Sequence, residues 1–282
     1  MENNYTHIPV LLEETIHELN VIEGGRYIDG TLGAGGHSEA ILKKGGLVLG
    51  IEADETMLKI AEERLSVYCP TLVRGNFGSM ELIATAQQLI PVDGVVLDLG
   101  ISNYHYDTLE RGFSFKRPNQ PLDLRLSTEQ GVTGSTLLNI LSEEQLRELF
   151  EPIIGNQKAR TIVRRVVERR LTKPFQTVGD LSNIAGSLSP ETFLALRIAV
   201  NTEFVVLEKG IVGAVNILKS KGRLAIISFH SLEDKIVSRL FKKLERDGIV
   251  RQLQKSPIIP SEKEIELNAK SRSALLRSIE KI

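Results

Sequence analysis

A cluster of glycines near the start of the chain has the spacing of a ligand-binding loop. Gly30, Gly33, Gly35 and Gly36 fall within seven residues, directly after the short apolar run 26–29. Glycine adopts backbone angles that other residues avoid, so the main chain can approach a ligand closely. Polar residues that open a helix follow the loop. A strand, a glycine loop and the start of a helix, in this order, predict the ligand-binding crevice of an open α/β sheet. The alternative is a tight turn that binds no ligand.

Two carboxylates occupy positions that complete such a crevice. Glu52 ends a second apolar run, 17 residues after Gly35. An acid there can accept hydrogen bonds from both ribose hydroxyls of a nucleoside cofactor, whereas by itself it would be a solvated turn residue. Asp98 ends the apolar run 93–98, next to the expected cofactor, and its alternative role is a helix cap or a loop carboxylate. Phe77, after the third run, could stack on an adenine or lie buried under a turn.

The cofactor class follows from what the loop lacks. The third glycine of a dinucleotide pattern would fall on Ser38, and no phosphate-binding lysine motif is present. S-adenosylmethionine carries no phosphate, so the pattern favours it over a phosphorylated cofactor. The five histidines show no metal-ligand spacing, so we expect no metal site. The segment 228–231 lacks the glycines of a hydrolase elbow, so we expect no nucleophilic serine.

Apolar runs and helical spacing alternate along the chain in a βαβ pattern. Helices are expected within 7–22, 54–65 and 79–89. Strands are expected at 26–29, 47–52, 71–74, 93–98, 222–228, 250–253 and 273–279, the last two at an antiparallel end of the sheet. After Gly100 the chain becomes polar and then purely helical. We therefore predict a discontinuous sheet domain, 1–109 and 208–282, with a helical insertion at 110–207.

Composition limits the class of protein. The chain has 282 residues, 41% of them hydrophobic, and a formal net charge of -1. Global charge therefore indicates no partner, and a nucleic-acid argument depends on local charge. Cys69 is the single cysteine, so no disulfide forms within the chain and a reducing compartment is expected. With no leader-like start and no membrane-length apolar run, we expect a cytoplasmic protein without membrane association.

A basic amphipathic helix is expected at 160–170. Its apolar stripe includes Ile162 and Val166, and five arginines occupy the remaining positions. These arginines form either a solvated face or a phosphate-contacting face. Further basic residues on both sides of the helix favour RNA. The candidate RNA contacts are Arg111, Lys116, Arg117, Arg125, Arg164 and Arg165.

Several long motifs together resemble one family. They are Asp29-Gly-Thr-Leu-Gly-Ala-Gly-Gly-His-Ser38, Asp93-Gly-Val-Val-Leu-Asp-Leu-Gly-Ile-Ser102, Arg111-Gly-Phe-Ser-Phe115, Pro121-Leu-Asp-Leu-Arg125, Ala195-Leu-Arg-Ile-Ala-Val-Asn201, Ser228-Phe-His-Ser-Leu-Glu-Asp234 and Ser271-Arg-Ser-Ala-Leu-Leu-Arg277, with His7-Ile-Pro-Val-Leu-Leu before them. This set resembles the RsmH/MraW family of S-adenosylmethionine-dependent methyltransferases. The chain departs from the family pattern at Glu52, where Asp is usual, and within 102–107.

The resemblance implies a class I, Rossmann-like α/β methyltransferase sheet with an inserted helical domain. It implies N4-methylation of a cytidine in the decoding centre (P-site) of 16S ribosomal RNA, with the naked RNA or the small ribosomal subunit as substrate. Carried over by motif, the cofactor contacts are Gly33, Gly35, Gly36, His37, Glu52, Phe77, Asp98 and His105.

The expected chemistry needs an acceptor for the N–H of the cytosine amine. Asp98 or a carbonyl of the 99–100 turn is the candidate, with Ser102 nearby, and Asp98 may alternatively only bind the cofactor. Two other functions are possible from the sequence. One is an RNA-binding or ribosome-assembly module with altered or lost activity, and the other is a methyltransferase acting on a small molecule.

Overall fold

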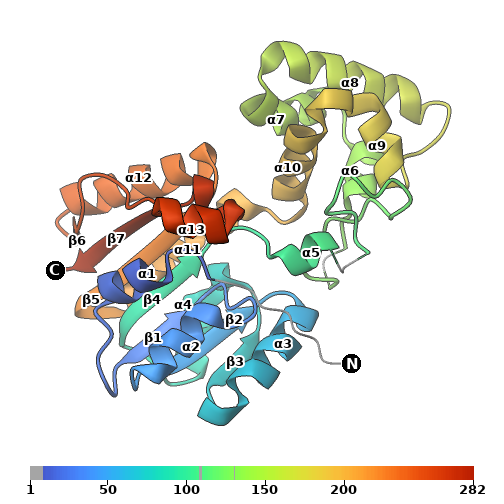
Figure 1. Cartoon of the computed structure of the whole chain (residues 1–282). Coiled ribbons are helices and arrows are strands. Elements are labelled where there is room, and N and C mark those ends of the chain that lie inside the picture. Colours follow the sequence, from blue (N-terminus) through green and yellow to red (C-terminus); the bar gives the residue numbers. More distant parts are fainter. Residues whose placement is uncertain (1–8, 108–109, 130) are drawn as a thin grey trace. The chain divides into compact units, whose positions relative to one another are not determined.

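A computed structural model describes residues 9–107, 110–129 and 131–282, without the side chains of Asn103 and Asp107. The chain forms two compact units (Figure 1). The sheet unit contains the described residues up to Gly100 and those from Phe204 onward, and the helical unit contains 101–203. The predicted insertion, 110–207, begins nine residues later and ends four residues later than the helical unit. The earlier start has a packing cause, because Ile101 and Tyr106 pack on the helical core.

The sheet unit contains a seven-stranded sheet that matches all seven predicted strands. Its strand order is β3-β2-β1-β4-β5-β7-β6. The strands are β1 (Arg26–Asp29), β2 (Leu47–Glu52), β3 (Thr71–Arg74), β4 (Val92–Asp98), β5 (Leu218–Ser228), β6 (Val250–Gln252) and β7 (Leu275–Lys281). The first five are parallel, while β7 pairs antiparallel with both β5 and β6. The prediction of an antiparallel end is therefore confirmed.

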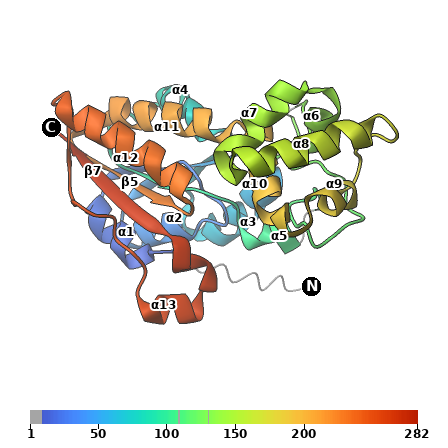
Figure 2. The same cartoon turned by 90° about the horizontal axis from the view of Figure 1, so that it is seen from above.

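Helices cover both faces of this sheet. They are α1 (Leu12–Leu19), α2 (Gly36–Lys43), α3 (Glu55–Leu65), α4 (Met80–Ala86), α11 (Glu203–Ile217) and α12 (Ser231–Arg246). A further short helix, α13 (Glu262–Leu267), accepts the N–H of Leu11, just before α1, through Glu264 Oε1. One apolar core joins the sheet to α4, α11 and α12, and a second joins the opposite face to α1 and α2 (Figure 2). The helix predicted within 7–22 is confirmed over 12–19, and His7 lies outside the described residues.

The strand order reverses beside β1, at the edge of the sheet where the glycine loop lies. From β1 the chain proceeds outward to β2 and β3, and it then returns to form β4 on the other side of β1. In doubly wound sheets, ligands bind at such a reversal, beyond the carboxyl ends of the strands. The register pairs Asp29 with Val96, so Asp29 and Asp98 end neighbouring strands at the same edge. The glycine loop begins directly after Asp29.

The helical unit has its own apolar core, which includes the buried side chains of Phe113, Phe150 and Phe175. Its helices are α5 (Asn103–Asp107), α6 (Gly134–Ile140), α7 (Glu143–Ile154), α8 (Asn156–Arg170), α9 (Val178–Ala185) and α10 (Ser189–Val200). Ser142 and Thr177 begin α7 and α9 with reciprocal side-chain caps. Across the described parts of both units, every helix is too short or too polar to span a bilayer.

Candidate functional site

The glycines of the loop have different roles. Gly35 has φ +80°, and a Cβ there would lie 2.9 Å from Leu65 Cδ1, while a Cβ on Gly36 would lie 2.3 Å from Pro9 Cγ. These two positions are glycine because protein atoms approach them closely. Gly33 also has a left-handed backbone, φ +52°, but the nearest atom to an added Cβ is Thr31 O, at 3.8 Å. Among the described residues, the space beside Gly33 is therefore open.

Glu52 lies at the end of β2 beside this loop. Its two carboxylate oxygens accept hydrogen bonds from the main-chain N–H groups of Gly33 and Asp54, both at 2.8 Å. Desolvation by the surrounding protein raises the pKa of Glu52 to about 7, although these N–H groups oppose the shift. The main-chain N–H of Ala53 also acts on this carboxylate, and a carboxylate has about four acceptor sites, so Glu52 retains capacity for a ribose hydroxyl.

Asp29 supports the start of the loop, a role that we did not predict from the sequence. Its side chain is buried and accepts hydrogen bonds from Ser38 Oγ at 2.7 Å and from Thr31 N at 3.2 Å. Burial raises the pKa of Asp29 to about 6, against the lowering effect of these donors. Its place at the head of the first family motif was the available signal in the sequence.

Asp98 lies at the centre of the strand ends. Its main-chain N–H donates to Thr31 Oγ1 at 2.6 Å, and its Oδ2 lies 3.8 Å from His37 Nδ1. Its buried Oδ1 has no hydrogen-bond partner within the described part of the chain. Burial, together with the negative charges of Asp29 and Glu233, raises the pKa of Asp98 well above its usual value. Such a carboxyl is suited to interact with a proton or a cation.

Glu233 is a second residue at the strand ends for which we predicted no role from the sequence. Its carboxylate accepts the main-chain N–H groups of Phe229 and His230 at 2.9 and 3.3 Å, and so caps the start of α12. The next residue, Asp234, makes a bidentate ion pair with Arg277 at 2.6 and 3.0 Å. The family motif 228–234 therefore anchors α12 beside the strand ends.

Phe77 packs against the protein. A Cβ added to Gly210 of α11 would lie 2.5 Å from the Phe77 ring, so the ring lies directly on that helix. Asn76 caps the turn through its Oδ1, which accepts from Gly78 N at 2.8 Å. The packing agrees with the alternative of a Phe under a turn, and adenine stacking on Phe77 stays a prediction.

Ser102 and His105 belong to the helical unit. Ser102 Oγ lies 2.9 Å from His105 Nδ1, and the buried His105 ring meets Phe113 edge to face at 5.4 Å. These contacts fix the two side chains relative to one another and to the helical core. A catalytic role for Ser102 and a cofactor contact by His105 stay predictions.

The candidate RNA contacts of the 111–125 segment divide into two kinds. Arg111 Nη1 donates to the carbonyls of Arg125 and Leu126, and Arg125 makes a bidentate pair with Asp123 at 2.7 and 2.8 Å. These two arginines hold the segment in shape. Lys116 and Arg117 are exposed and so have the accessibility that phosphate contact needs.

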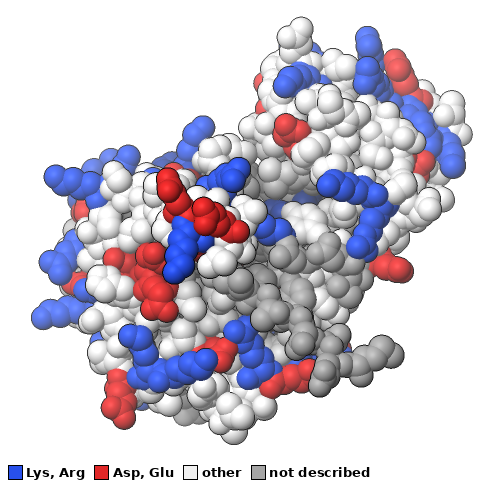
Figure 3. Space-filling view, viewed as in Figure 1, with Lys and Arg blue, Asp and Glu red and all other residues white. Residues whose placement is uncertain are grey.

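The arginines of α8 divide in the same way. Arg165 donates to Ile184 O, Arg169 pairs with Asp180 at 2.7 Å, and Arg170 donates to the carbonyls that end α6. Arg160 and Arg164 are exposed, the latter 3.9 Å from Glu168. The visible face of the helical unit carries basic side chains interspersed with acidic ones (Figure 3). Arg165 is exposed as well, so three of the five arginines keep the accessibility that the predicted phosphate contact needs.

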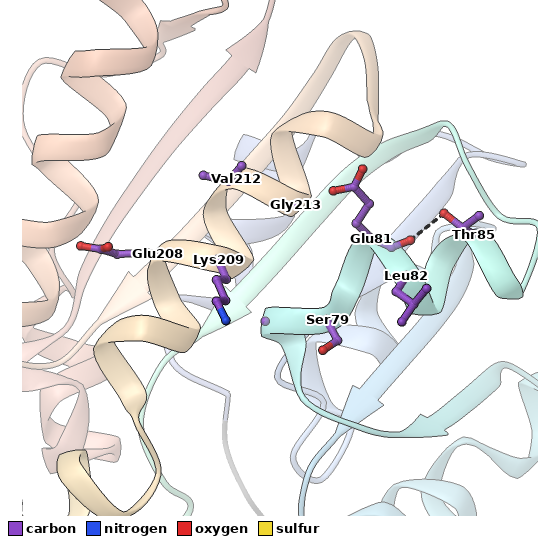
Figure 4. Close-up of a pocket in the computed structure, with 9 residues that line it drawn as sticks. Ser79, Glu81, Leu82, Thr85, Glu208, Lys209, Val212 and Gly213 are labelled. Carbon is purple, nitrogen blue, oxygen red and sulfur yellow. Dashed lines mark hydrogen bonds between the residues drawn. The ribbon is translucent and has the colours of Figure 1, made fainter.

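A separate groove of about 740 Å³ lies between α4 and α11 (Figure 4). Leu82 and Val212 line it together with Glu81, Glu208 and Lys209. None of the strand-end carboxylates lines this groove, so we place the candidate site at the strand ends instead.

The sequence of the whole chain matches known proteins. The pattern of the MraW methylase family matches residues 4–282. The protein named ribosomal RNA small subunit methyltransferase H from Clostridium botulinum (strain Loch Maree / Type A3) is 40% identical over 99% of both chains. Its namesake from Carboxydothermus hydrogenoformans is 37% identical over 99% of this chain and 98% of its own. A solved rRNA methylase from Streptococcus thermophilus superposes with a TM-score of 0.47 at 12% identity, covering 98% of this chain and 99% of its own.

Proposed function

Because the chain belongs to the MraW methylase family, we propose that it methylates ribosomal RNA of the small subunit with S-adenosylmethionine as donor. Relatives of 37–40% identity over nearly their full length carry this activity in their names. The finer proposal is N4-methylation of a cytidine in the decoding centre of 16S ribosomal RNA, which the family resemblance implies. The observation that carries the proposal is Asp98, a half-buried carboxyl at the switch point of the sheet whose buried Oδ1 has no hydrogen-bond partner among the described residues.

The strand ends fit this cofactor. Glu52 offers carboxylate lone pairs to ribose hydroxyls, and the open space beside Gly33 admits a ligand close to the main chain. The α2 amides that follow Gly35 lie at a helix start, where N–H groups lack helical partners. When bound, S-adenosylmethionine supplies a methyl group on a positively charged sulfur. The acids Asp29, Asp98 and Glu233 favour positive charge at this edge of the sheet.

Asp98 is the proposed acceptor for the N–H of the target amine. The lone pair of a cytosine amine is delocalised into the ring, so the amine is a poor nucleophile. A carboxylate that accepts its N–H orients the nitrogen and favours the geometry in which the lone pair points at the methyl group. Orientation of this kind can contribute about 7–11 kcal/mol of a reaction barrier.

The helical unit is the proposed RNA-binding part. Lys116, Arg117, Arg160 and Arg164 expose their charges and can contact phosphates. Arg111 and Arg125 act through the shape of the segment that they hold. A base must leave its stack to reach a crevice at strand ends, which costs a few kcal/mol. Phosphate contacts that hold the RNA backbone can offset this cost.

The test is methyl transfer from labelled cofactor to small ribosomal subunits and to naked 16S RNA, followed by mapping of the modified nucleotide. Asp98→Ala is expected to lower turnover by about 10²–10⁴-fold, the usual contribution of a positioned acid or base. Its free energy of unfolding should not fall, because burial already disfavours the ionised carboxyl.

Asp98→Asn is the matched variant of similar volume, and it should also be slow because an amide is a weaker acceptor than a carboxylate. Near-wild-type turnover of either variant would remove Asp98 from the chemistry. Wild-type protein that binds the subunit but transfers no methyl group would instead favour an RNA-binding or assembly role.

A further inference from the structure

The His37 side chain is held between two protein groups. Its Nε2 lies 3.1 Å from the carbonyl oxygen of Val10, and its Nδ1 lies 3.8 Å from Asp98 Oδ2. The residue is only 5% exposed. Both ring nitrogens are thus directed at protein atoms, although the family pattern assigns this position to cofactor binding.

The chemistry of the two neighbours restricts the protonation of the ring. A carbonyl oxygen can only accept, so Nε2 must carry a hydrogen to bond with Val10 O. In the neutral ring Nδ1 then has a lone pair, and it faces a carboxylate oxygen that is also an acceptor. At 3.8 Å the two atoms are too far apart for a hydrogen bond, but a protonated ring forms an ion pair with an ionised Asp98 at this distance.

The surroundings of Asp98 explain why such a partner matters. The titratable groups that face it are Asp29 from β1, Glu233 from α12 and His37 from α2. Two of these are acids whose negative charges oppose ionisation of Asp98. His37 is the group among them that can become positive, so it is the one that favours the carboxylate form.

We propose that His37 is a positioning residue for Asp98. Its ring, anchored on Val10, orients the Asp98 carboxyl and keeps it ionised, so that Oδ1 can accept the N–H of the target amine. The inference rests on the proposed function of Asp98. It also implies that the cofactor contact at position 37 belongs to the main-chain N–H rather than to the imidazole.

Two substitutions separate this role from a purely structural one. A Gln side chain places its amide near the position of Nε2, so His37→Gln can keep the bond to Val10 O but loses the group facing Asp98. An Asn amide lies near the position of Nδ1, so His37→Asn keeps a donor toward Asp98 but loses the bond to Val10. Both variants are tested as full-length protein with S-adenosylmethionine and small ribosomal subunits.

We expect kcat of His37→Gln to fall by about tenfold or more at pH 7, one pKa unit in the ionisation of Asp98 being a factor of ten. Its KM for the cofactor should change less, and its rate should recover as pH rises because Asp98 then ionises without a positive neighbour. His37→Asn should be faster than His37→Gln. The reverse ranking, or a kcat of His37→Gln equal to that of wild type, would overturn the inference.

A second measurement keeps the inference testable if His37→Gln does not fold. The pKa of the His37 ring is followed by NMR in wild type and in Asp98→Asn. We expect a lower His37 pKa in Asp98→Asn, because the carboxylate that stabilises the imidazolium is gone. An unchanged His37 pKa would refute the coupling. Failure of the proposed function is distinguishable, because wild-type protein would then methylate no ribosomal RNA.

Discussion

Substitution of two loop glycines by alanine should separate a packing role from a ligand-binding role. Gly33 and Gly35 both have a left-handed backbone, which costs an alanine about 1–2 kcal/mol. Both substitutions also restrict the unfolded chain, which returns about 0.4–1 kcal/mol. The backbone contribution to each ΔΔG is therefore about 0–1.6 kcal/mol. The two sites differ in what the new methyl group would touch.

At Gly35 the methyl group would lie 2.9 Å from Leu65 Cδ1 and 3.1 Å from Leu65 Cγ. Leu65 is fully buried, so it cannot move aside into solvent. Overpacking of this kind costs about 1–3 kcal/mol, which brings the expected ΔΔG of Gly35→Ala to about 1–5 kcal/mol. At Gly33 the nearest atom is 3.8 Å away, so Gly33→Ala should show only the backbone contribution.

The assay combines urea unfolding with calorimetry of S-adenosylmethionine binding. We expect Gly35→Ala to be less stable than Gly33→Ala, and Leu65→Ala to relieve part of the strain in a double-mutant cycle. Gly33→Ala should lose no more than the backbone contribution of about 0–1.6 kcal/mol, but it should bind cofactor more weakly because its methyl group enters the open space beside the loop. Equal stability of the two variants, or unchanged cofactor affinity of Gly33→Ala, would refute the assignment of roles to these glycines.

Four further predictions concern charged side chains. Because the pKa of Glu52 is raised to about 7, cofactor affinity should fall as pH drops below 7, and cofactor binding should release protons. Calorimetry in buffers of different ionisation enthalpy measures the number of protons released. Glu52→Gln should remove most of this proton release. By the same linkage, the stability that Glu52 contributes is present below its unfolded pKa of about 4.5 and lost as pH rises through 7, so urea unfolding should show a flatter pH dependence for Glu52→Gln. Neutralising exposed Lys116 and Arg117 to Gln should reduce the salt dependence of RNA binding by about two phosphate contacts without loss of stability. Arg277→Gln should instead destabilise the protein by about 1–3 kcal/mol, because it leaves Asp234 unpaired, and it should leave the salt slope unchanged.

The strand ends were predictable because their signals are local. Runs of apolar, β-branched residues that end in a carboxylate located Glu52 and Asp98, and parallel strands bring their carboxyl ends to one edge of a sheet. The length and composition of the runs sufficed for all seven strands. The predicted start of the helical unit was less accurate, because Ile101 packs on the helical core through a contact that no local sequence pattern indicates.

The roles of the arginines could not be predicted from the sequence, because they too depend on contacts between residues that are far apart in the chain. Arg111 donates to carbonyls 14 and 15 residues away, and Arg170 donates to the carbonyls of Leu138 and Leu141. In the sequence these residues look the same as exposed Arg160 and Arg164. A long side chain with five donors finds main-chain acceptors wherever the fold brings them, so charge patterning overestimates the surface available to RNA.

The acids at the strand ends show why the site itself departs from the rules that predict a stable core. Asp29, Asp98 and Glu233 come from three different elements, and the first two have raised pKa values because ionisation there is unfavourable. Asp29 and Glu233 are buried and hydrogen-bonded, but Asp98 Oδ1 is buried with no partner among the described residues, which costs stability that an apolar side chain would not cost. Stability is lost at a site when the strained arrangement serves a ligand. A positively charged methyl donor is a ligand that relieves this repulsion, whereas a phosphorylated cofactor would increase it. The repulsion among these acids therefore discriminates between the two cofactor classes more directly than the spacing of the glycines does.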